Sequence, residues 1–409
     1  MTSVKGFRDF YPEEKRTLNY IFDIWKSVAQ KYGYQEIDIP ILEPVEIYNK
    51  SGEEIPEQIY SFIDKGKRAL ALRPETTPSV ARMVKQKSSL KKPIKWYSIS
   101  QCYRYERVQK GRSREFFQFN LDYLGTKSME SDAEVITTLI KILTSLKLTE
   151  NDFCIKISNR KLINDLFRNL KILCVKDIAR LLDKRSRISD KELKTELVNL
   201  DLSSRQVKGV LDFLNFKELK QIKIESEGLD ELKELFDILK RYKLTKFLKL
   251  DLSIMRGFDY YTGTVFEAFD KKGDLRSIAG GGRYDNLAGM PGVGYGFGDT
   301  VLNIFLEEKK LLPELNSETD IFIIPIKNLD KCIPIAEELR KSNIKVNLDL
   351  LKRSISKNLD YANKEKIPYV LIIGEDELKK NKVKLKNMFS GEEKLTSVKN
   401  VIKEIQNGT

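Results

Sequence analysis

Four polar side chains could share one face of a β-sheet and bind a ligand there. Arg104 and Glu106 end one segment of alternating residues, and Gln118 and Asp122 lie in the next. Alternate residues of an extended chain point to the same face, so each segment places these groups on one side and aromatic rings on the other. A face this polar must meet water, another polar surface or a ligand. A solvated antiparallel sheet has the same pattern, and both interpretations stay open at this point.

Three further segments carry residues suited to ligand binding. Residues 72–78, Leu-Arg-Pro-Glu-Thr-Thr-Pro, follow an apolar stretch and precede a helical pattern. Residues 256–263, Arg-Gly-Phe-Asp-Tyr-Tyr-Thr-Gly, place an arginine after an apolar strand. The glycines of residues 279–285, Ala-Gly-Gly-Gly-Arg-Tyr-Asp, allow close approach to the backbone, but they match neither the P-loop nor the dinucleotide-binding pattern. Taken alone, the first segment also fits a helix start, the second a pair of half-buried tyrosines, and the third a turn.

The composition excludes several kinds of chemistry. The chain has no histidine, which removes imidazole as a general base, a triad member or a metal ligand. The cysteines lie far apart, so neither a disulfide framework nor a thiolate zinc site is indicated; they are Cys102, Cys154, Cys174 and Cys332, and we expect core thiols. Any reaction must therefore use carboxylates, Arg, Lys, Tyr, backbone groups or the substrate itself.

Length and charge set further bounds. The chain has 409 residues, too many for one typical domain, and this predicts two or three. Its formal net charge of +13 makes a polyanionic partner plausible without requiring one. No apolar run approaches the roughly 20 residues that span a bilayer, and the N-terminus lacks the apolar core of a signal peptide. We therefore expect a cytoplasmic protein with no membrane segment.

Local patterns predict the elements that position these groups. Apolar residues at helical spacing predict a helix over 13–32. A short strand is predicted over 34–43, with its proline at an edge or an irregularity. Residues 97–106 and 115–125 predict two strands of a long hairpin with a basic, glycine-containing loop. A second helix follows, with Ser131 as its expected capping residue.

The coarser pattern divides the chain into three parts. Residues 160–245 are charge-dense with helical periodicity and predict an α-helical insertion. Strand-like alternation returns after it and continues into a glycine-rich stretch. From residue 320 apolar strands alternate with helices, which predicts a small α/β domain with a largely parallel sheet.

Together the motifs resemble one family, the histidyl-tRNA synthetases, which are class II aminoacyl-tRNA synthetases. The resemblance starts at residues 5–10, Lys-Gly-Phe-Arg-Asp-Phe, and includes motif 1 around Pro40 and motif 2 at residues 103–106 with 116–118. The Arg-Gly-x-Asp-Tyr-Tyr signature beginning at Arg256 is the most specific part, and the glycine run ending at Asp285 is a second histidine-specific signature.

The resemblance implies a fold, an activity and partners. The expected α+β fold has an antiparallel sheet with flanking helices in a catalytic domain, residues 1–159 and 246–310. A helical insertion at 160–245, a linker at 311–319 and an α/β anticodon-binding domain at 320–409 complete it. The implied activity is the ATP-dependent attachment of histidine to its tRNA through a histidyl-adenylate. Mg²⁺ would arrive with ATP as a substrate complex, and a homodimer is expected because motif 1 usually builds the dimer interface in this class.

The resemblance also implies roles for named residues. Arg104 would hold the α-phosphate and the carboxylate side of histidine, and Arg256 would stabilise charge on that phosphate. Contacts with adenine or the outer phosphates would come from three residues, Glu106, Arg112 and Arg114. The motif 2 loop would approach the acceptor end of tRNA through Arg107, Gln109 and Lys110.

The implied histidine pocket has its own set of residues. Glu75 and Thr77 would take the α-amino group, and Gln118 would bridge the amino and carboxylate ends. Asp122 with Tyr261 would face the imidazole, and Tyr260 would lie in the same pocket. A carboxylate opposite a ring N–H selects histidine over apolar isosteres, because a poor fit leaves a buried charge without a partner.

One position departs from the family pattern. Motif 3 usually ends in an arginine that meets ATP, whereas here Gly296-Phe297-Gly298-Asp299-Thr300 is followed by Val301. The way in which ATP is held is therefore open, and Arg283 is a possible partial substitute. The departure slightly favours an alternative, a histidine-binding regulatory paralogue resembling the regulatory subunit of ATP phosphoribosyltransferase. A tRNA-binding module without aminoacylation is a third possibility.

Overall fold

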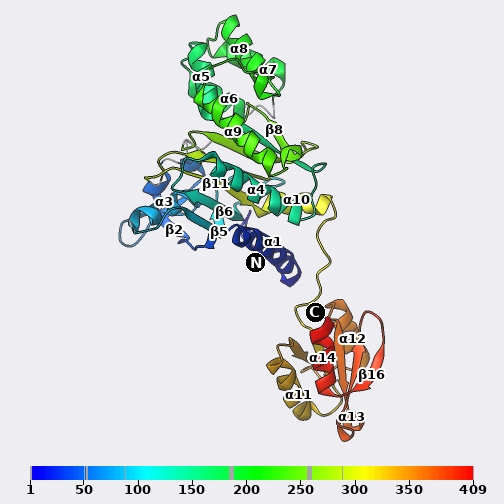
Figure 1. The fold of residues 1–409 in the computed structure, drawn as a ribbon. Coiled ribbons are helices and arrows are strands. Elements are labelled where there is room, and N and C mark those ends of the chain that lie inside the picture. The colour runs from blue at the N-terminus through cyan, green and yellow to red at the C-terminus, as the bar shows by residue number, and fades with distance from the viewer. Residues whose placement is uncertain are drawn as a thin grey trace. The chain divides into compact units, whose positions relative to one another are not determined.

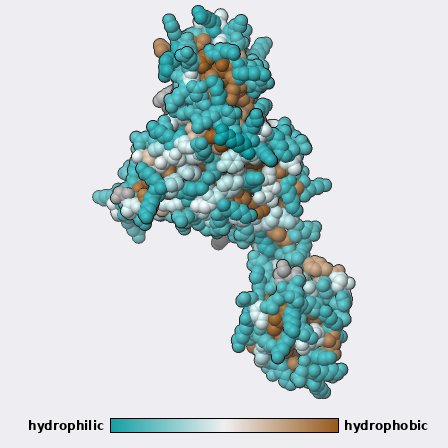
Figure 2. All heavy atoms as spheres, viewed as in Figure 1, coloured by the Kyte–Doolittle hydropathy of each residue, from teal (hydrophilic) through white to brown (hydrophobic). Residues whose placement is uncertain are grey.

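The computed structural model describes residues 2–49, 51, 54–87, 89–183, 188–255, 260–287 and 289–408. The chain folds into two compact units, Met1–Leu312 and Pro313–Thr409, and each is described by itself (Figure 1). Arg256, a predicted site residue, lies outside the described residues. None of the described helices is long and apolar enough to cross a bilayer. On the face seen in Figure 2, hydrophilic residues predominate, with smaller apolar groups between them.

An eight-stranded sheet forms the centre of the first unit. Its strands in spatial order are β1 (Gln35–Glu36), β5 (Ile94–Tyr103), β6 (Glu115–Leu124), β11 (Gly292–Gly298), β10 (Ala279–Tyr284), β9 (Thr264–Asp270), β7 (Phe153–Asn159) and β8 (Leu248–Leu250). Neighbouring strands are antiparallel except at the two edges, where β1 pairs with β5 and β7 pairs with β8 in parallel. The expectation of an antiparallel sheet is confirmed.

The predicted hairpin is present as β5 and β6. Their pairing runs from Ile94 opposite Leu124 to Tyr103 opposite Glu115. The first strand therefore ends three residues earlier than predicted, and Arg104 lies just beyond it. The Arg104 N–H still donates to the carbonyl of Arg114 at 2.9 Å, so the two chains stay together past the regular pairing.

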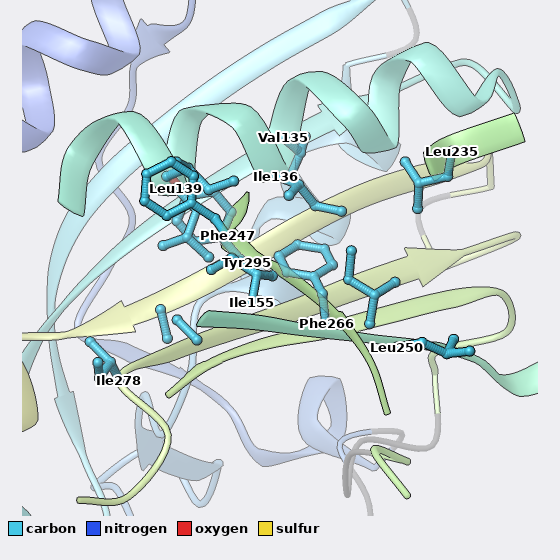
Figure 3. Packing of buried hydrophobic residues seen from close by; sticks show 14 of the residues in the cluster. Val135, Ile136, Leu139, Ile155, Leu235, Phe247, Leu250, Phe266, Ile278 and Tyr295 are labelled. Atoms are coloured by element: carbon cyan, nitrogen blue, oxygen red, sulfur yellow. The ribbon is translucent and has the colours of Figure 1, made fainter. Parts of the chain in front are cut away.

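Helices cover one face of this sheet. They are α1 (Pro12–Lys31), α4 (Met129–Ser145), α9 (Glu227–Arg241) and α10 (Asp299–Glu308). The helical pattern predicted over 13–32 is thus confirmed as α1, whose Trp25 ring lies 5.5 Å from that of Phe119 and 5.4 Å from that of Phe297. Figure 3 shows residues of α4 packing on side chains of the sheet, including Phe266 and Tyr295.

The start of α4 corrects one prediction. Ser128, not Ser131, is the N-cap, and its Oγ accepts from the Glu130 N–H. Ser131 lies one turn later, where its Oγ donates to the Ser128 carbonyl at 2.6 Å. Serine is preferred at N-caps and both positions carry it, so the sequence pattern alone did not separate them.

Helices dominate the described chain between β7 and β8. They are α5 (Arg160–Asn169), α6 (Val175–Asp183), α7 (Asp190–Asn199), α8 (Ser204–Leu214) and α9. Ser189 and Ser203 each begin a helix with a capping box. The last helix, α9, packs against α4, β7 and β9, so it belongs to the sheet's core as well as to the helical region. The boundaries of a separate insertion stay a prediction.

The single strand predicted over 34–43 was wrong. The chain forms β1 in the large sheet and then β2 (Leu42–Pro44) in a separate three-stranded sheet with β4 (Ala69–Leu72) and β3 (Tyr60–Ile63). Pro40 lies between the two strands, where the chain leaves one sheet for the other. Proline lacks the N–H that a continuous strand needs, which fits this break. Helix α3 (Thr77–Gln86) follows β4.

The second unit has its own five-stranded sheet and core. The strands in spatial order are β13 (Val346–Leu348), β12 (Ile321–Pro325), β14 (Tyr369–Ile373), β15 (Val383–Asn387) and β16 (Glu393–Thr396). The first three are parallel, as predicted, and β15 is antiparallel to both of its neighbours. Helices α11 (Leu329–Lys341) and α14 (Val398–Gly408) contribute to one apolar core of this unit, and α12 (Ile355–Lys364) contributes to another.

Candidate functional site

A large cavity lies on the face of the eight-stranded sheet opposite the helices α1 and α4. Its volume is about 1600 Å³. Strand alternation explains the two faces, because Phe119 and Phe297 enter the core whereas their neighbours Gln118 and Gly296 line the cavity.

Glycines of β10 and β11 keep the cavity open. A Cβ on Gly296 would lie 2.4 Å from Gln118 Nε2, and one on Gly294 would lie 2.6 Å from Asp122 Oδ1. Real side chains do not approach this closely, so any larger residue would displace the polar groups of β6. In the run 279–285, a Cβ on Gly281 would lie 2.0 Å from the Gly294 carbonyl oxygen, so this glycine lets two strands approach closely, and the run's approach to a ligand stays a prediction.

A buried carboxylate and two tyrosines form one wall of the cavity. Tyr260 Oη donates to Glu75 Oε2 at 2.9 Å, and Glu75 is only 2% exposed. Burial, and then the charge of Glu75, raise the pKa of Tyr260 well above its usual value, so it stays a hydroxyl donor. The ring of Tyr261 lies 4.8 Å from that of Tyr260, and Thr77 at the start of α3 lines the same wall.

Asp122 is buried and is not among the residues that line the cavity. The carboxylate is 3% exposed and accepts from Tyr284 Oη at 2.8 Å. Burial raises the pKa of Asp122 to about 7; the Tyr284 hydrogen bond works against this rise and the nearby Glu75 adds to it. Tyr284 was missed as a site residue. The only signal for it was its place in the run 279–285, which also carries a turn interpretation.

Arg104 enters the cavity beside Glu106 and Arg112. Its Nε donates to the Pro74 carbonyl at 2.9 Å, and its guanidinium lies 5.2 Å from the Phe116 ring centroid. Glu106 is 8% exposed and forms an ion pair with Arg112 Nε. These three predicted residues are thus brought together, with Phe116 as an aromatic neighbour in the same lining.

Arg114 takes a different position. Its guanidinium stacks 4.1 Å from the centroid of the Tyr105 ring, and its Nε donates to the Glu106 carbonyl at 3.2 Å. It is not among the residues that line the cavity. It supports the backbone that carries Glu106.

The hairpin loop exposes the residues predicted to meet the acceptor end, which are Arg107, Gln109 and Lys110. Gln109 and Arg112 exchange backbone hydrogen bonds of 3.1 and 2.8 Å, and Gly111 between them has φ +75°. Lys110 Nζ lies 2.8 Å from Glu308 Oε1 at the end of α10. The loop therefore rests on α10.

The motif 3 departure lies at the first turn of α10. Val301 lines the cavity with Gly298 and Thr300, and a Cβ on Gly111 would lie 3.2 Å from Val301 Cγ2. The position that carries arginine in the family pattern is thus occupied by a small apolar side chain against the hairpin loop.

Arg283 does not substitute for the missing arginine, and this suggestion was wrong. It is 2% exposed, and its guanidinium forms an ion pair with Asp132 of α4. The remaining donors reach the Thr126 carbonyl at 3.0 Å, the Ser128 carbonyl at 3.1 Å and Ser131 Oγ at 2.7 Å. Arg283 occupies a β10 position of opposite parity to Gly280, so its side chain enters the core face and cannot reach the cavity.

Thiols and carboxylates are the side chains that could bind a metal ion in a chain without histidine. No group of three Cys, Asp or Glu residues in the described parts of the chain could hold a metal ion. Cys102 and Cys332 are buried core thiols, and burial raises the pKa of the Cys102 thiol to about 12. Cys154 is half-buried and lines the cavity.

Comparisons with known proteins agree on one family. The histidyl-tRNA synthetase family model matches residues 6–297, and an anticodon-binding domain model matches residues 320–408. A histidine–tRNA ligase of Leptospira biflexa is 41% identical, covering 94% of this chain and 93% of the relative. One of Thermoplasma volcanium is 35% identical over 99% of this chain and 98% of its own length. The crystal structure of histidyl-tRNA synthetase from Nostoc is similar, with a TM-score of 0.85, 26% identity, and coverage of 100% of this chain and 99% of that chain.

Proposed function

The chain belongs to the histidyl-tRNA synthetase family, and on that premise we propose that its cavity activates histidine with ATP and transfers it to tRNA. The observation that carries the proposal is that the Glu75–Tyr260 pair and Arg104 line the same cavity. The Glu75–Tyr260 pair can hold a cationic α-amino group, and the nearby Arg104 can hold an anionic phosphate. An aminoacyl-adenylate presents these two groups on one molecule.

Histidine would bind with its amino group at Glu75 and Thr77 and its ring toward Asp122. A charged Asp122 accepts a hydrogen bond from the imidazole N–H, while Tyr284 holds the other side of the carboxylate. Tyr261 supplies a flat neighbour for the ring. The pocket discriminates against residues without a ring N–H, because Asp122 would then be buried without its ligand partner.

Activation is a displacement at the α-phosphorus of ATP. A histidine carboxylate oxygen forms the new P–O bond while the bond to the β-phosphate oxygen breaks, and pyrophosphate leaves with that electron pair. Arg104 would stabilise the negative charge on the α-phosphate during this step, because a guanidinium stays charged and binds phosphate oxygens in a fixed geometry. Arg256 is proposed for the same phosphate, on the resemblance alone. Mg²⁺ would arrive with ATP as part of the substrate.

Transfer uses the terminal ribose of tRNA. Its hydroxyl oxygen attacks the carbonyl carbon of the adenylate, and AMP leaves. A phosphate oxygen of the adenylate would take the proton, so no imidazole is required and a chain without histidine can carry out the reaction. Positioning of the two substrates supplies much of the rate.

The second unit would read the anticodon, and the exposed hairpin loop would meet the acceptor end through Arg107, Gln109 and Lys110. Contacts of Lys and Arg with phosphates would make tRNA binding weaker at high salt. A homodimer through motif 1 is also proposed, following the class. The cytoplasmic location stays a prediction from the sequence.

The regulatory-paralogue alternative has less support. The crystal structure of an ATP phosphoribosyltransferase regulatory subunit/histidyl-tRNA synthetase from Bacillus halodurans is similar, with a TM-score of 0.76, but its identity is 23%, so the likeness concerns the fold alone. The presence of Arg104 in the cavity and of the second unit both favour the synthetase.

The test is histidine-dependent exchange of pyrophosphate into ATP by the purified protein. We expect exchange with histidine and not with other amino acids, and a loss of at least 100-fold in Arg104→Met, since an oriented charge on the transition state contributes several kcal/mol. Arg107→Met is the matched control, because Arg107 is exposed on the same hairpin and exchange needs no tRNA. Histidine binding without any exchange would contradict the proposal and favour the regulatory paralogue.

A further inference from the structure

We propose that Arg276 binds the outer phosphates of ATP in place of the arginine that Val301 replaces. This inference rests on the proposed function and adds a substrate-binding residue to it. Arg276 lies in the connection between β9 and β10 and lines the same cavity as Arg104 and Val301. The sequence patterns did not single it out, because it lies outside every motif.

Arg276 precedes β10 and lines the same cavity as the first turn of α10. The regular pairing ends at Ala279 opposite Phe297. Beyond this pair, residues 276–278 are no longer in the strand, and β11 gives way to α10 at Asp299. Arg276, Thr300 and Val301 line the same cavity. A guanidinium lost from one side of this cleft is thus present on the other.

The side chains of Arg276 and Arg283 have different surroundings. Residues of β10 alternate between the helix-covered core and the cavity, so Gly280 lines the cavity while Arg283 enters the core. Arg276 precedes the strand, and it lines the cavity together with its neighbours in the turn before β10. Of the two arginines, only Arg276 lines the cavity.

The turn that carries Arg276 is ordered by a buried carboxylate. Asp270 is 6% exposed at the end of β9, and it accepts from the N–H groups of Asp274 at 3.2 Å and Leu275 at 3.1 Å. The Ile278 N–H donates to the Ala268 carbonyl at 2.8 Å on the other side. Arg276 is held between these anchors, which lowers the entropy lost when its side chain binds a ligand.

This turn also lies near the hairpin loop that would cover ATP. The pKa of Lys110 is raised chiefly by its ion pair with Glu308, and Asp274 contributes to the same effect. The turn, the loop and the first turn of α10 thus surround one end of the cavity. Arg112 enters from the loop and Arg276 from the turn, so two guanidinium groups can meet a triphosphate whose α-phosphate lies at Arg104.

The test compares ATP with a ligand that lacks the outer phosphates. The histidine sulfamoyl-adenosine has adenine, ribose and a group in the α-phosphate position, but nothing beyond it. We expect Arg276→Ala to weaken ATP binding roughly 10- to 100-fold, the range for losing a charged hydrogen bond to phosphate, while analogue binding changes less than about twofold. Arg276→Lys should fall between, because an ammonium keeps the charge but not the planar fork. Calorimetry of the full chain measures both ligands.

Lys272→Ala is the matched control, because Lys272 is exposed on the same turn and does not line the cavity. It should leave both affinities unchanged. Retained analogue binding shows that Arg276→Ala is folded. An equal loss for ATP and the analogue, or no loss for ATP, would overturn the inference. Both affinities can be measured without turnover, so this outcome is distinct from a failure of the proposed function, which would appear as absent exchange in the unaltered protein.

Discussion

At the scale of single residues, the charge state of Asp122 governs how tightly histidine is held. Burial raises its pKa to about 7, so the carboxyl is largely protonated at pH 6 and largely charged at pH 8. Only the charged form accepts strongly from the imidazole N–H. We expect the KM for histidine of Asp122→Asn, relative to that of the unaltered protein, to rise from pH 6 to pH 8. The measurement is histidine-dependent exchange at saturating ATP, and a constant ratio would contradict it.

The raised pKa of Asp122 also makes the stability of the protein depend on pH. Between pH 4 and pH 7 the folded protein holds a proton on Asp122 that the unfolded chain has lost, so this group's stabilising contribution declines as pH rises through that window. The Tm of Asp122→Asn minus that of the unaltered protein should therefore increase from pH 4 to pH 7 and level off above it. Thermal unfolding followed by circular dichroism checks this, and a difference independent of pH would refute the assignment.

Arg283 illustrates a residue whose role is structural although it lies in a functional motif. It ties β10 to α4 through a buried ion pair with Asp132, whose pKa burial raises and Arg283 lowers. We expect Arg283→Met to lose about 3–5 kcal/mol of unfolding free energy, because it leaves an uncompensated buried charge. Adding Asp132→Leu should recover much of the loss. Urea denaturation measures the unfolding free energy of both variants. If the losses from the two single substitutions simply add in the double variant, the pairing is contradicted.

At the scale of elements, the glycine strands β10 and β11 divide into sites that shape the pocket and sites that hold the sheet together. Gly296→Ala should raise the KM for histidine roughly tenfold while leaving the protein folded, because its Cβ would meet side-chain ends, chiefly that of Gln118 and then Asn120, and no backbone atom. Gly281→Ala should instead destabilise by about 1–3 kcal/mol or more, since its Cβ would lie 2.0 Å from the Gly294 carbonyl oxygen.

Gly298→Ala is the control for this pair. No atom lies within 4 Å of a Cβ placed there, and the residue has no positive φ that would strain alanine. Exchange kinetics and Tm of the three variants separate the two roles. Equal effects at all three positions would show that backbone conformation, and not the space around each Cβ, determines the effect of a Gly→Ala substitution.

At the scale of the whole molecule, the two units have separate cores and can be tested separately. Residues 1–312 contain the complete cavity, whereas 313–409 contain the domain matched to anticodon binding. We expect a fragment of residues 1–312 to keep histidine-dependent exchange, which needs no tRNA, and to lose at least tenfold in kcat/KM for tRNA in aminoacylation. Loss of exchange in a folded fragment would show that the units depend on each other.

The sequence by itself determined the elements whose signals are local. The amphipathic pattern of α1 and the alternation in β5 and β6 predicted those elements to within a few residues, because periodicity depends on neighbouring positions only. The resemblance placed Glu75, Arg104 and Tyr260 in one pocket, and the cavity contains all three.

Only the tertiary structure decided what depends on contacts between distant segments. The break of the predicted strand at Pro40, the burial of Asp122 beside Tyr284, and the burial of Arg283 against α4 all follow from how strands pair and which face the helices cover. Alternation assigns residues to two faces but does not say which face is buried. That choice is made when α4 packs on the sheet, and it places Arg283 of β10 in the core.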